Sequence, residues 1–351
     1  MATQTFFSKQ TKLNADSIEF CPQFDPSLFA CGTYQLIEQK EGEQTSQKKV
    51  GCLYLFQLFE SDNNLEFREL QAIDTSAILD LKWSGPINSQ PEILGQVSSN
   101  GTLIVYSLQQ TDNNTKLEQK EQYEFENTPI ALSLDWNNHV HSRETLQIAT
   151  SLGDSTVCIF QLDSSSIRLL SQWKTNEQYE TWITAFDNHN PNLVYSGGDD
   201  GLFRGWDIRQ DSPSMLFSKR YDCGVTSIQS CPFAENLLAV GSYDDTLKLW
   251  DTRNMKRPLC ELNTGGGVWR IKWHPTRSDL ILTACMRSGF KLVRTNLQSE
   301  LQTIDEFRPD CQPIAYGADW CYWKNDKYPY ATATCSFYDQ HCSLWIPSNT
   351  T

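Results

Sequence analysis

An all-β fold is predicted for this chain: a single β-propeller of seven blades. The main observation is that SGGDDGLFRGWDIR, at residues 196–209, recurs as GSYDDTLKLWDTR at residues 241–253. Each run reads as an apolar strand ending in Gly, a tight turn that bears Asp, and an alternating strand that closes with Trp-Asp. The second observation is that five weaker copies of this pattern spread over the 351 residues. Small sheets of this kind bury their faces only against their neighbours, so seven units predict one closed ring.

The first three units precede the clear repeats. DSIEFCP, LFACGTY and VGCLYLFQL form the first, expected at about 16–60, with the polar stretch 39–49 as an exposed insertion. SAILDLKW and SSNGTLIVYSL form the second, at about 76–108. PIALSLDW and ATSLGDSTVCIFQL form the third, at about 129–162. The charged, Gln-rich stretch 109–122 is expected to be a hairpin or an exposed loop between blades.

The last four units follow at similar spacing. ETWITAF opens the fourth, at about 180–208, and GVTSIQSCP opens the fifth, at about 224–254. GGVWRIKWHP with LTACMRSGFKLV gives the sixth, at about 266–296, and PIAYGADW with ATCSFYDQHCSLW gives the seventh, at about 313–347. A closed ring requires a segment that links its first and last blades. Residues 1–15 contain the alternating run TFFSKQTKL. We expect this run to supply the outer strand of the seventh blade.

Composition argues against several classes of partner. The formal net charge of -14 disfavours nucleic acid, because phosphate recognition rests on clustered Lys and Arg. No stretch is apolar enough for a signal peptide or a membrane span, so we expect a cytoplasmic, monomeric protein with no membrane partner. The twelve cysteines show no C-x-x-C spacing and no His/Cys cluster has zinc-ligand spacing. Neither a metal nor a cofactor is therefore expected.

The candidate site is predicted from geometry, because familiar hydrolase and nucleotide-binding motifs are missing. In a propeller, the starts of the innermost strands and the turns after the second strands converge on one end of the ring axis. Large aromatic side chains and carboxylates fall at these positions, which predicts a rim suited to a quaternary ammonium group or to a generic protein partner. The residues concerned are Asp16, Glu180, Trp182, Trp269 and Tyr316 at strand starts, and Tyr34, Asp199, Tyr243 and Tyr338 at turns.

The Trp-Asp pairs Trp206-Asp207 and Trp250-Asp251 are typical of WD40 propeller blades. Longer words of the sequence resemble one family of WD40 proteins, the diphthine methylesterase family. They run from the first unit to the last and comprise LFACGTYQL, DTSAILDLKW, VYSGGDDGLFRGWD, GSYDDTLKLWDTRNMKRPL, GGVWRIKWHP, CMRSGFKL, YGADW and ATCSFYDQHCSLW. The resemblance implies hydrolysis of the methyl ester of methylated diphthine on translation elongation factor 2, a step of diphthamide biosynthesis. The substrate side chain would carry a trimethylammonium group.

Roles at the rim are hypotheses, since the resemblance supplies no catalytic motif. Glu180 or Asp199 would act as general base on water, or His341 if the seventh blade turns it inward. Arg270 or backbone N–H groups would stabilise the oxyanion. Substrate binding falls to the aromatic side chains, with the elongation factor as the protein partner. The substrate-binding set is Trp182, Trp269, Tyr243, Tyr338, Tyr316 and Asp16.

Two other functions stay open at this level. A WD40 propeller can be a non-catalytic scaffold that docks a protein at its rim, and fold alone does not choose between scaffold and enzyme. A metal-assisted hydrolase would use Asp16, Glu180 and Asp199 together at the rim. Loss of a methyl group from the esterified factor would separate the esterase from the scaffold, and sensitivity to a chelator would reveal the metal enzyme.

Overall fold

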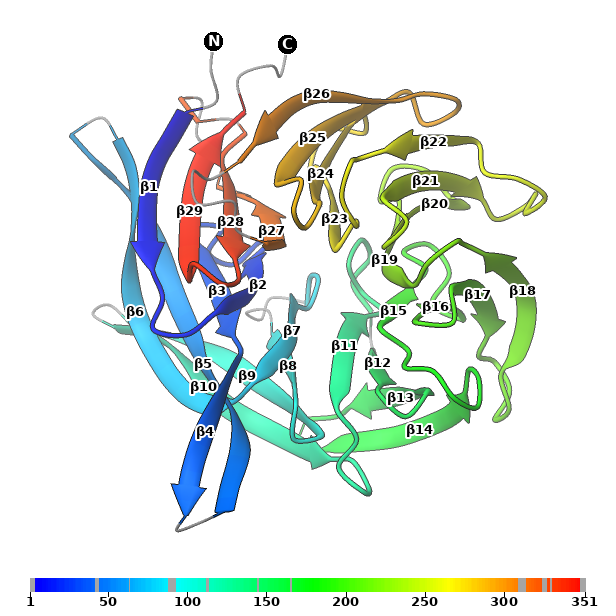
Figure 1. Ribbon diagram of the computed structural model, residues 1–351, viewed down its shortest axis with the longest axis horizontal. Coiled ribbons are helices and arrows are strands. Elements are labelled where there is room, and N and C mark those ends of the chain that lie inside the picture. Colours follow the sequence, from blue (N-terminus) through cyan, green and yellow to red (C-terminus); the bar gives the residue numbers. More distant parts are fainter. Residues whose placement is uncertain are drawn as a thin grey trace.

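The predicted seven-bladed propeller is confirmed (Figure 1). The computed structural model describes residues 4–41, 44–62, 64–87, 93–111, 114–143, 145–164, 166–308, 314–323, 327–328 and 330–347, with the backbone alone for 4–6, 39–41 and 44–46. These residues form seven antiparallel sheets, and the first strands of successive blades contact one another around the ring axis. We call the space between these innermost strands the channel. Within the described ranges there is no helix long and apolar enough to cross a membrane.

The first three blades are built from consecutive strands. Blade 1 holds β2 (Ala15–Phe20), β3 (Leu28–Thr33), β5 (Gln44–Ser61) and β6 (Asn64–Ser76), with β4 (Gln35–Glu41) paired to the start of β5. Blade 2 holds β7 (Ile78–Trp83), β8 (Ile93–Ser98), β9 (Thr102–Thr111) and β10 (Asn114–Glu124). Blade 3 holds β11 (Ala131–Trp136), β12 (Leu146–Leu152), β13 (Thr156–Leu162) and β14 (Ile167–Lys174).

The remaining blades complete the ring. Blade 4 holds β15 (Ile183–Phe186), β16 (Leu193–Gly197), β17 (Leu202–Asp207) and β18 (Ser214–Arg220). Blade 5 holds β19 (Val225–Ser230), β20 (Leu237–Ser242), β21 (Thr246–Asp251) and β22 (Cys260–Asn263). Blade 6 holds β23 (Arg270–Trp273), β24 (Leu280–Ala284), β25 (Phe290–Thr295) and β26 (Leu301–Phe307). Blade 7 holds β27 (Ala315–Trp320), β28 (Thr332–Ser336), β29 (His341–Ile346) and β1 (Gln4–Gln10).

The seventh blade joins the two ends of the chain. Strand β1 pairs antiparallel with β29, from Gln4 opposite Ile346 to Gln10 opposite His341. The backbone N–H of Thr11 then donates to the carbonyl of Gln340. The outer strand of the last blade is thus supplied by the first residues of the chain.

Each of blades 1 to 6 carries an outer strand beyond the range expected from the sequence. The stretch 109–122 is a hairpin within blade 2, formed by the end of β9 and most of β10, and not a connection between blades. The sequence does not reveal the outer strands, because each contacts the rest of its blade along one edge only. Side chains of β14, for example, alternate between half-buried and exposed along its whole length, without an apolar run.

Side chains of the innermost strands fasten each blade to the next. The indole N–H groups of Trp83, Trp136 and Trp320 donate to backbone carbonyls of the preceding blade, at 2.9 to 3.0 Å. Carboxylates on the same strands accept from backbone N–H groups of the following blade, as Asp319 does from Phe20 at 2.8 Å. These bonds fix the relative position of neighbouring innermost strands, and with it the geometry of the channel.

Buried ion pairs fill the lower part of the channel. Glu19 of blade 1 lies 2.8 Å from the ammonium of Lys82 in blade 2 and 2.5 Å from that of Lys272 in blade 6. Above them, the Arg270 guanidinium lies 3.0 Å from Asp80, so that side chains of blades 6 and 2 meet across the axis. All five residues are at most 8% exposed. These side chains therefore bridge the channel below its upper end, where the innermost strands begin.

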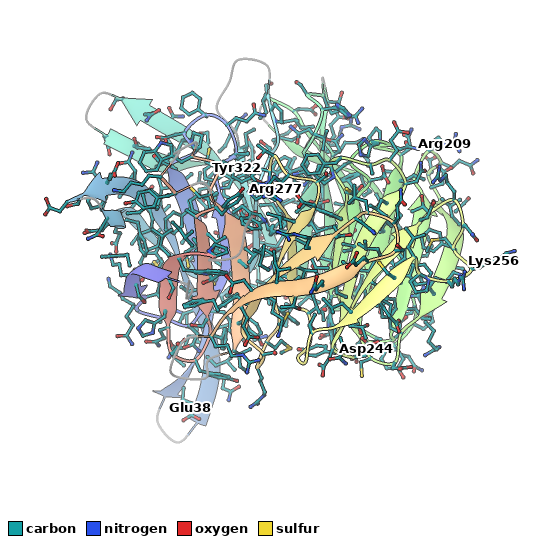
Figure 2. All side chains as sticks on the ribbon, turned by 90° about the horizontal axis from the view of Figure 1, so that it is seen from above. Glu38, Arg209, Asp244, Lys256, Arg277 and Tyr322 are labelled. Atoms are coloured by element: carbon teal, nitrogen blue, oxygen red, sulfur yellow. The ribbon has the colours of Figure 1, made fainter. Side chains whose placement is uncertain are left out.

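We call that upper end the mouth. It lies at the face where the innermost strands begin, which points downward in Figure 2. Asp244, in the β20–β21 turn, marks this face in Figure 2, and Arg277 and Tyr322, which follow the ends of innermost strands, mark the opposite face. The hairpin of β4 and the start of β5, labelled at Glu38, projects beyond the ring on the side of Asp244.

Candidate functional site

Aromatic rings from four blades form a continuous row at the mouth. The ring centroids of Trp182 and Tyr243 lie 5.2 Å apart, and those of Tyr243 and Trp269 lie 5.8 Å apart. Trp269 and Tyr316 stack at 4.9 Å, and Tyr316 and Phe337 follow at 5.2 Å. We call these five residues the aromatic row. Ring contacts at these distances are favourable pairs, so the row is a connected surface and not a set of separate side chains.

Two further tyrosines extend the row at its blade 7 end. Tyr338 contacts Phe337 at 5.1 Å between ring centroids and is 71% exposed. Tyr34, which follows β3 in blade 1, stacks on Phe337 at 5.9 Å. The sequence placed Tyr338 in the substrate-binding set and Tyr34 at the rim, and the structure adds Phe337 between them.

β-bulges aim two of the predicted residues at the mouth. The pairing of β2 with β3 shifts register between Ala15 and Ser17, and that of β27 with β28 shifts between Ala315 and Gly317. Asp16 and Tyr316 are thus the extra residues of their bulges. A bulge re-aims a side chain out of the regular alternation, and such bulges are common beside active sites.

Two exposed carboxylates lie at the blade 4 end of the row. The indole N–H of Trp182 donates to Glu180 Oε2 at 3.1 Å, and the backbone N–H of Asp199 donates to the carbonyl of Glu180. Gly198 permits this approach, because a Cβ there would lie 2.1 Å from that carbonyl oxygen. Burial and then the Asp199 carboxylate raise the pKa of Tyr243. Acids and aromatic faces are therefore side by side.

The position of Trp182 depends on a glycine of the next blade. A Cβ built on Gly224 would lie 2.3 Å from the indole ring of Trp182, so any larger residue would displace the ring. The indole ring packs over Gly224, the residue that precedes β19, and so reaches the aromatic row.

Asp16 lies at the blade 1 side of the mouth and is 6% exposed. Burial raises the pKa of its carboxyl, the Arg270 guanidinium opposes this and the nearby Asp80 carboxylate adds to it, which leaves the pKa at about 8. Burial and then Asp16 raise the pKa values of Tyr34 and Tyr316. Asp16 is therefore close enough to the buried guanidinium and to these two tyrosines for its charge to interact with all three groups.

The structure keeps His341 away from the innermost strands. It opens β29, the third strand of blade 7, and its Nδ1 lies 2.8 Å from the carbonyl oxygen of Asp339. The expectation that the seventh blade turns it inward is therefore not met, because β27 and β28 stand between it and the channel. Among the described residues, Asp16, Glu180 and Asp199 included, no group of three His, Cys, Asp or Glu side chains is arranged to hold a metal ion.

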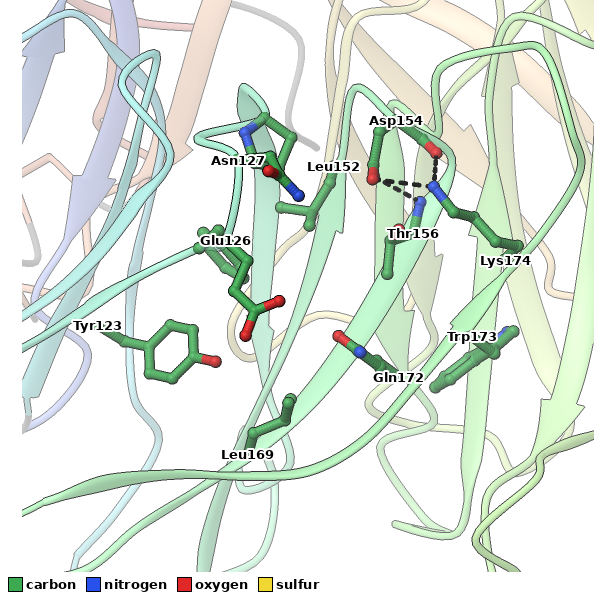
Figure 3. Close-up of a pocket in the computed structure, with 12 residues that line it drawn as sticks. Tyr123, Glu126, Asn127, Leu152, Asp154, Thr156, Leu169, Gln172, Trp173 and Lys174 are labelled. Carbon is green, nitrogen blue, oxygen red and sulfur yellow. Dashed lines mark hydrogen bonds and ion pairs between the residues drawn. The ribbon is translucent and has the colours of Figure 1, made fainter.

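Two cavities accompany the site. One of about 430 Å³ adjoins the mouth and is lined by residues 176–179, Asp199, Asp200 and the side chain of Arg220. The other, of about 440 Å³, lies between the outer parts of blades 2 and 3, where Tyr123, Glu126 and Gln172 surround it (Figure 3). None of the predicted site residues lines this second cavity. Of the predicted residues, Asp199 lines the first cavity.

This arrangement suits a cation on a flexible chain. Faces of Trp and Tyr attract a quaternary ammonium group through the ring quadrupole, and the carboxylates of Glu180 and Asp199 supply counter-charge. Arg270, held by Asp80, offers a guanidinium at the bottom of the mouth. Sequence reasoning missed Asp80, whose role appears only when Arg270 reaches it across the axis, and Phe337, although Phe337 precedes Tyr338 in the same predicted turn.

Comparisons with known proteins agree with the fold. The family model described as "WD domain, G-beta repeat" matches residues 215–251, which begin in the outer strand of blade 4 and end with the third strand of blade 5. A solved structure described as "Crystal Structure of Mitotic Checkpoint Complex" superposes with a TM-score of 0.70 at 15% identity, over 98% of this chain and 92% of that chain. At this identity the likeness concerns the fold alone.

Similarity to curated proteins is closer. A Dictyostelium discoideum protein named "Diphthine methyltransferase homolog" is 37% identical over 372 residues, which cover 97% of this chain and 98% of that protein. The human protein named "Diphthine methyltransferase" is 39% identical over 334 residues, 88% of this chain and 73% of that protein. A Schizosaccharomyces pombe protein of the same name is 28% identical over 94% of both.

Proposed function

This chain belongs to the diphthine methyltransferase family of WD-repeat proteins, and we propose that it acts in diphthamide biosynthesis by removing a methyl group through hydrolysis. The substrate would be methylated diphthine on translation elongation factor 2. Water would convert its methyl ester to the free carboxylic acid and methanol.

The aromatic row is the observation that carries this proposal. Diphthine bears a trimethylammonium group, which cannot donate a hydrogen bond and is bound best by ring faces and nearby carboxylates. Trp182, Tyr243 and Trp269 offer such faces, and Glu180 and Asp199 lie at one end of the row. In this proposal these two exposed acids serve as counter-charges, which replaces the expectation that one of them is the general base.

The position of the ester follows from the reach of the substrate. With the ammonium group against the rings, the ester end of the same side chain would extend toward Arg270 at the bottom of the mouth. A guanidinium there would stabilise the negative charge that develops on the ester oxygen during attack by water. The net charge of -14 would favour approach to a basic surface of the elongation factor.

The test is a reaction with purified, methyl-esterified elongation factor 2, followed by mass spectrometry of the modified peptide and an assay for methanol. We expect loss of one methyl group and release of one methanol for each factor molecule. The relatives carry the name methyltransferase, so gain of a methyl group from a donor would identify transfer and refute hydrolysis. Binding without any change in mass would support the scaffold instead.

A further inference from the structure

We propose that Asp16 is the general acid–base catalyst of the mouth, acting beside an Arg270 that Asp80 holds in place. This assignment rests on the proposed ester hydrolysis and gives it a catalytic residue. The argument starts from a contrast between Asp16 and the other carboxylates of the channel.

The other buried carboxylates on the innermost strands have partners. Glu19 accepts from two ammonium groups, and Asp80 contacts Lys82, Arg270 and the backbone N–H of Leu134. Asp319 accepts from the backbone N–H groups of Phe20 and Trp320. Asp135 accepts from the N–H of Phe186 and lies 2.6 Å from the ring of His139.

Asp16 differs from all of these. It is as buried as they are, at 6% exposed, yet no described residue donates a hydrogen bond to its carboxyl group or lies within ion-pair distance of it. Its carboxyl oxygens are not among the enclosed polar atoms that lack a partner, so they can be reached from the mouth. An unpaired acid in a native fold calls for a reason other than stability. A substrate or a water molecule at the mouth would supply the missing partner.

The location of Asp16 gives it the right neighbours for ester hydrolysis. The bulge between Ala15 and Ser17 places it at the mouth end of β2. The residue after Tyr316, Gly317, packs on the backbone of Ser17, so Asp16 and Tyr316 belong to neighbouring strand starts. Arg270 is close enough to act on its ionisation, and Asp80 holds the guanidinium at 3.0 Å. An ester bound below the rings would therefore meet an acid–base group and an oxyanion-stabilising group from different blades.

The reaction balances with these groups and one water molecule. The Asp16 carboxylate removes a proton from water as the water oxygen bonds to the ester carbon, and the carbonyl electron pair moves onto oxygen beside Arg270. When the carbonyl re-forms, the bond from carbon to the methoxy oxygen breaks. Asp16 returns the proton to that oxygen, so methanol leaves and the carboxylic acid remains.

The ionisation of Asp16 matches this role. A pKa of about 8 places it near the pH at which the protein would work, where a group can both accept and return a proton. The hydrolysis rate should rise with pH as Asp16 loses its proton. The charged and titratable groups that face it from neighbouring elements are Arg270 of β23, Asp80 of β7, Tyr34 after β3, Tyr316 of β27 and Cys335 of β28.

The experiment compares the full-length wild type with Asp16→Asn and Asp16→Glu on methyl-esterified elongation factor 2 in single-turnover assays. We expect Asp16→Asn to bind the factor within about twofold of wild type while its rate falls by about 100-fold or more, the usual range for loss of an acid–base group. Asp16→Glu should recover part of the rate. Glu69→Gln, an exposed change on an outer strand, is the control and should leave the rate unchanged.

A pH series on the wild type provides the second readout. We expect the rate to rise to a plateau with a midpoint near 8, and the midpoint to move in Asp16→Glu. A rate independent of pH between 7 and 9, or an Asp16→Asn variant that folds and retains the wild-type rate, would overturn the role of Asp16 alone. Absence of hydrolysis by the wild type would overturn the proposed function itself.

Discussion

Asp16 and Glu19 lie three residues apart on β2, are buried to nearly the same extent, and differ in almost every other respect. Burial raises both pKa values, but Lys272, Lys82 and Arg270 outweigh it at Glu19 and bring that pKa down to about 2. At Asp16, Arg270 opposes burial only in part, and the pKa remains at about 8. The charge of a buried carboxyl group is thus decided by its partners rather than by burial.

The two halves of the channel differ in the same way as these two acids. The lower half has paired charges and ties blades 1, 2 and 6 together, so its acids contribute to stability. The upper half contains an acid without an ion-pair partner, Asp16, at the same end as the aromatic row. This acid does not stabilise the free protein. Variants of the two acids should therefore have opposite effects on folding.

The largest expected effect is loss of stability in Glu19→Gln. This change would remove one of the two carboxylate partners of each buried ammonium group. Lys82 would keep Asp80 at 3.2 Å and Lys272 would keep Asp319 at 3.5 Å, so the loss should lie at the lower end of the range for breaking a buried pair, about 3 kcal/mol. The free energy of unfolding, from urea denaturation at pH 7, measures it. Glu69→Gln, which breaks an exposed pair with Lys9, should cost about 1 kcal/mol or less. Equal losses in both variants would contradict the division of the channel.

The next effect has the opposite sign. The folded-state pKa of Asp16 lies above its ordinary value of 3.8, so its ionisation removes stability progressively as the pH rises from about 4 to about 8. Asn carries no such cost, so Asp16→Asn should be nearly equal to wild type in stability at pH 4 and should become the more stable of the two as the pH rises toward 8. Thermal unfolding across this range tests it. A difference that does not grow with pH would show that Asp16 ionises freely.

A smaller effect is expected at the middle of the aromatic row. Trp269→Leu removes the ring between Tyr243 and Tyr316, and affinity for a trimethylammonium side chain should fall by about 1–2 kcal/mol. Trp269→Phe keeps a ring and should lose less. Titration with a diphthine peptide measures both, and an uncharged tert-butyl analogue should bind the two variants alike. If the affinities of Trp269→Leu and Trp269→Phe for the analogue differ as much as their affinities for the peptide, the row recognises shape and not charge.

The smallest effect belongs to the exposed acids. Glu180→Gln and Asp199→Asn should each weaken binding of the same peptide by about 0.5 kcal/mol at low salt, because exposed charges are well screened. The effect should disappear at about 1 M salt, where the screening length is about 3 Å. A loss of tenfold or more in either variant, undiminished by salt, would move that residue into the buried class that Asp16 represents.

The sequence predicts the ring and most of the mouth because both follow from local pattern. Asp16 and Tyr316 fall at strand starts in any alignment of the units, and Tyr243 and Tyr338 fall in turns that Asp and Gly make recognisable. Outer strands such as β14 bury too little apolar surface to produce a run. The contact of Arg270 with Asp80 joins residues 190 positions apart, through the curvature of the whole ring, so no local pattern announces it.

The chemistry of Asp16 was equally out of reach of the sequence. DSIEF reads as an ordinary innermost strand with two acids, and nothing in those letters says that Glu19 receives two ammonium groups while Asp16 receives none. The bulge after Ala15 sets the direction of the side chain, and a bulge depends on the register with β3. The residue types were predictable from the sequence, but the ion pairs that each acid makes were not.

Closure of the ring by β1 has a consequence for biosynthesis. Asp16 is synthesised before Tyr316 and Phe337, because it precedes both in the chain by 300 residues or more. Blade 7, which contains both β1 and the much later strands β27 to β29, lies beside blade 1 and its Asp16. A nascent chain that ends before blade 7 is made therefore carries the acid without Tyr316 and Phe337 beside it.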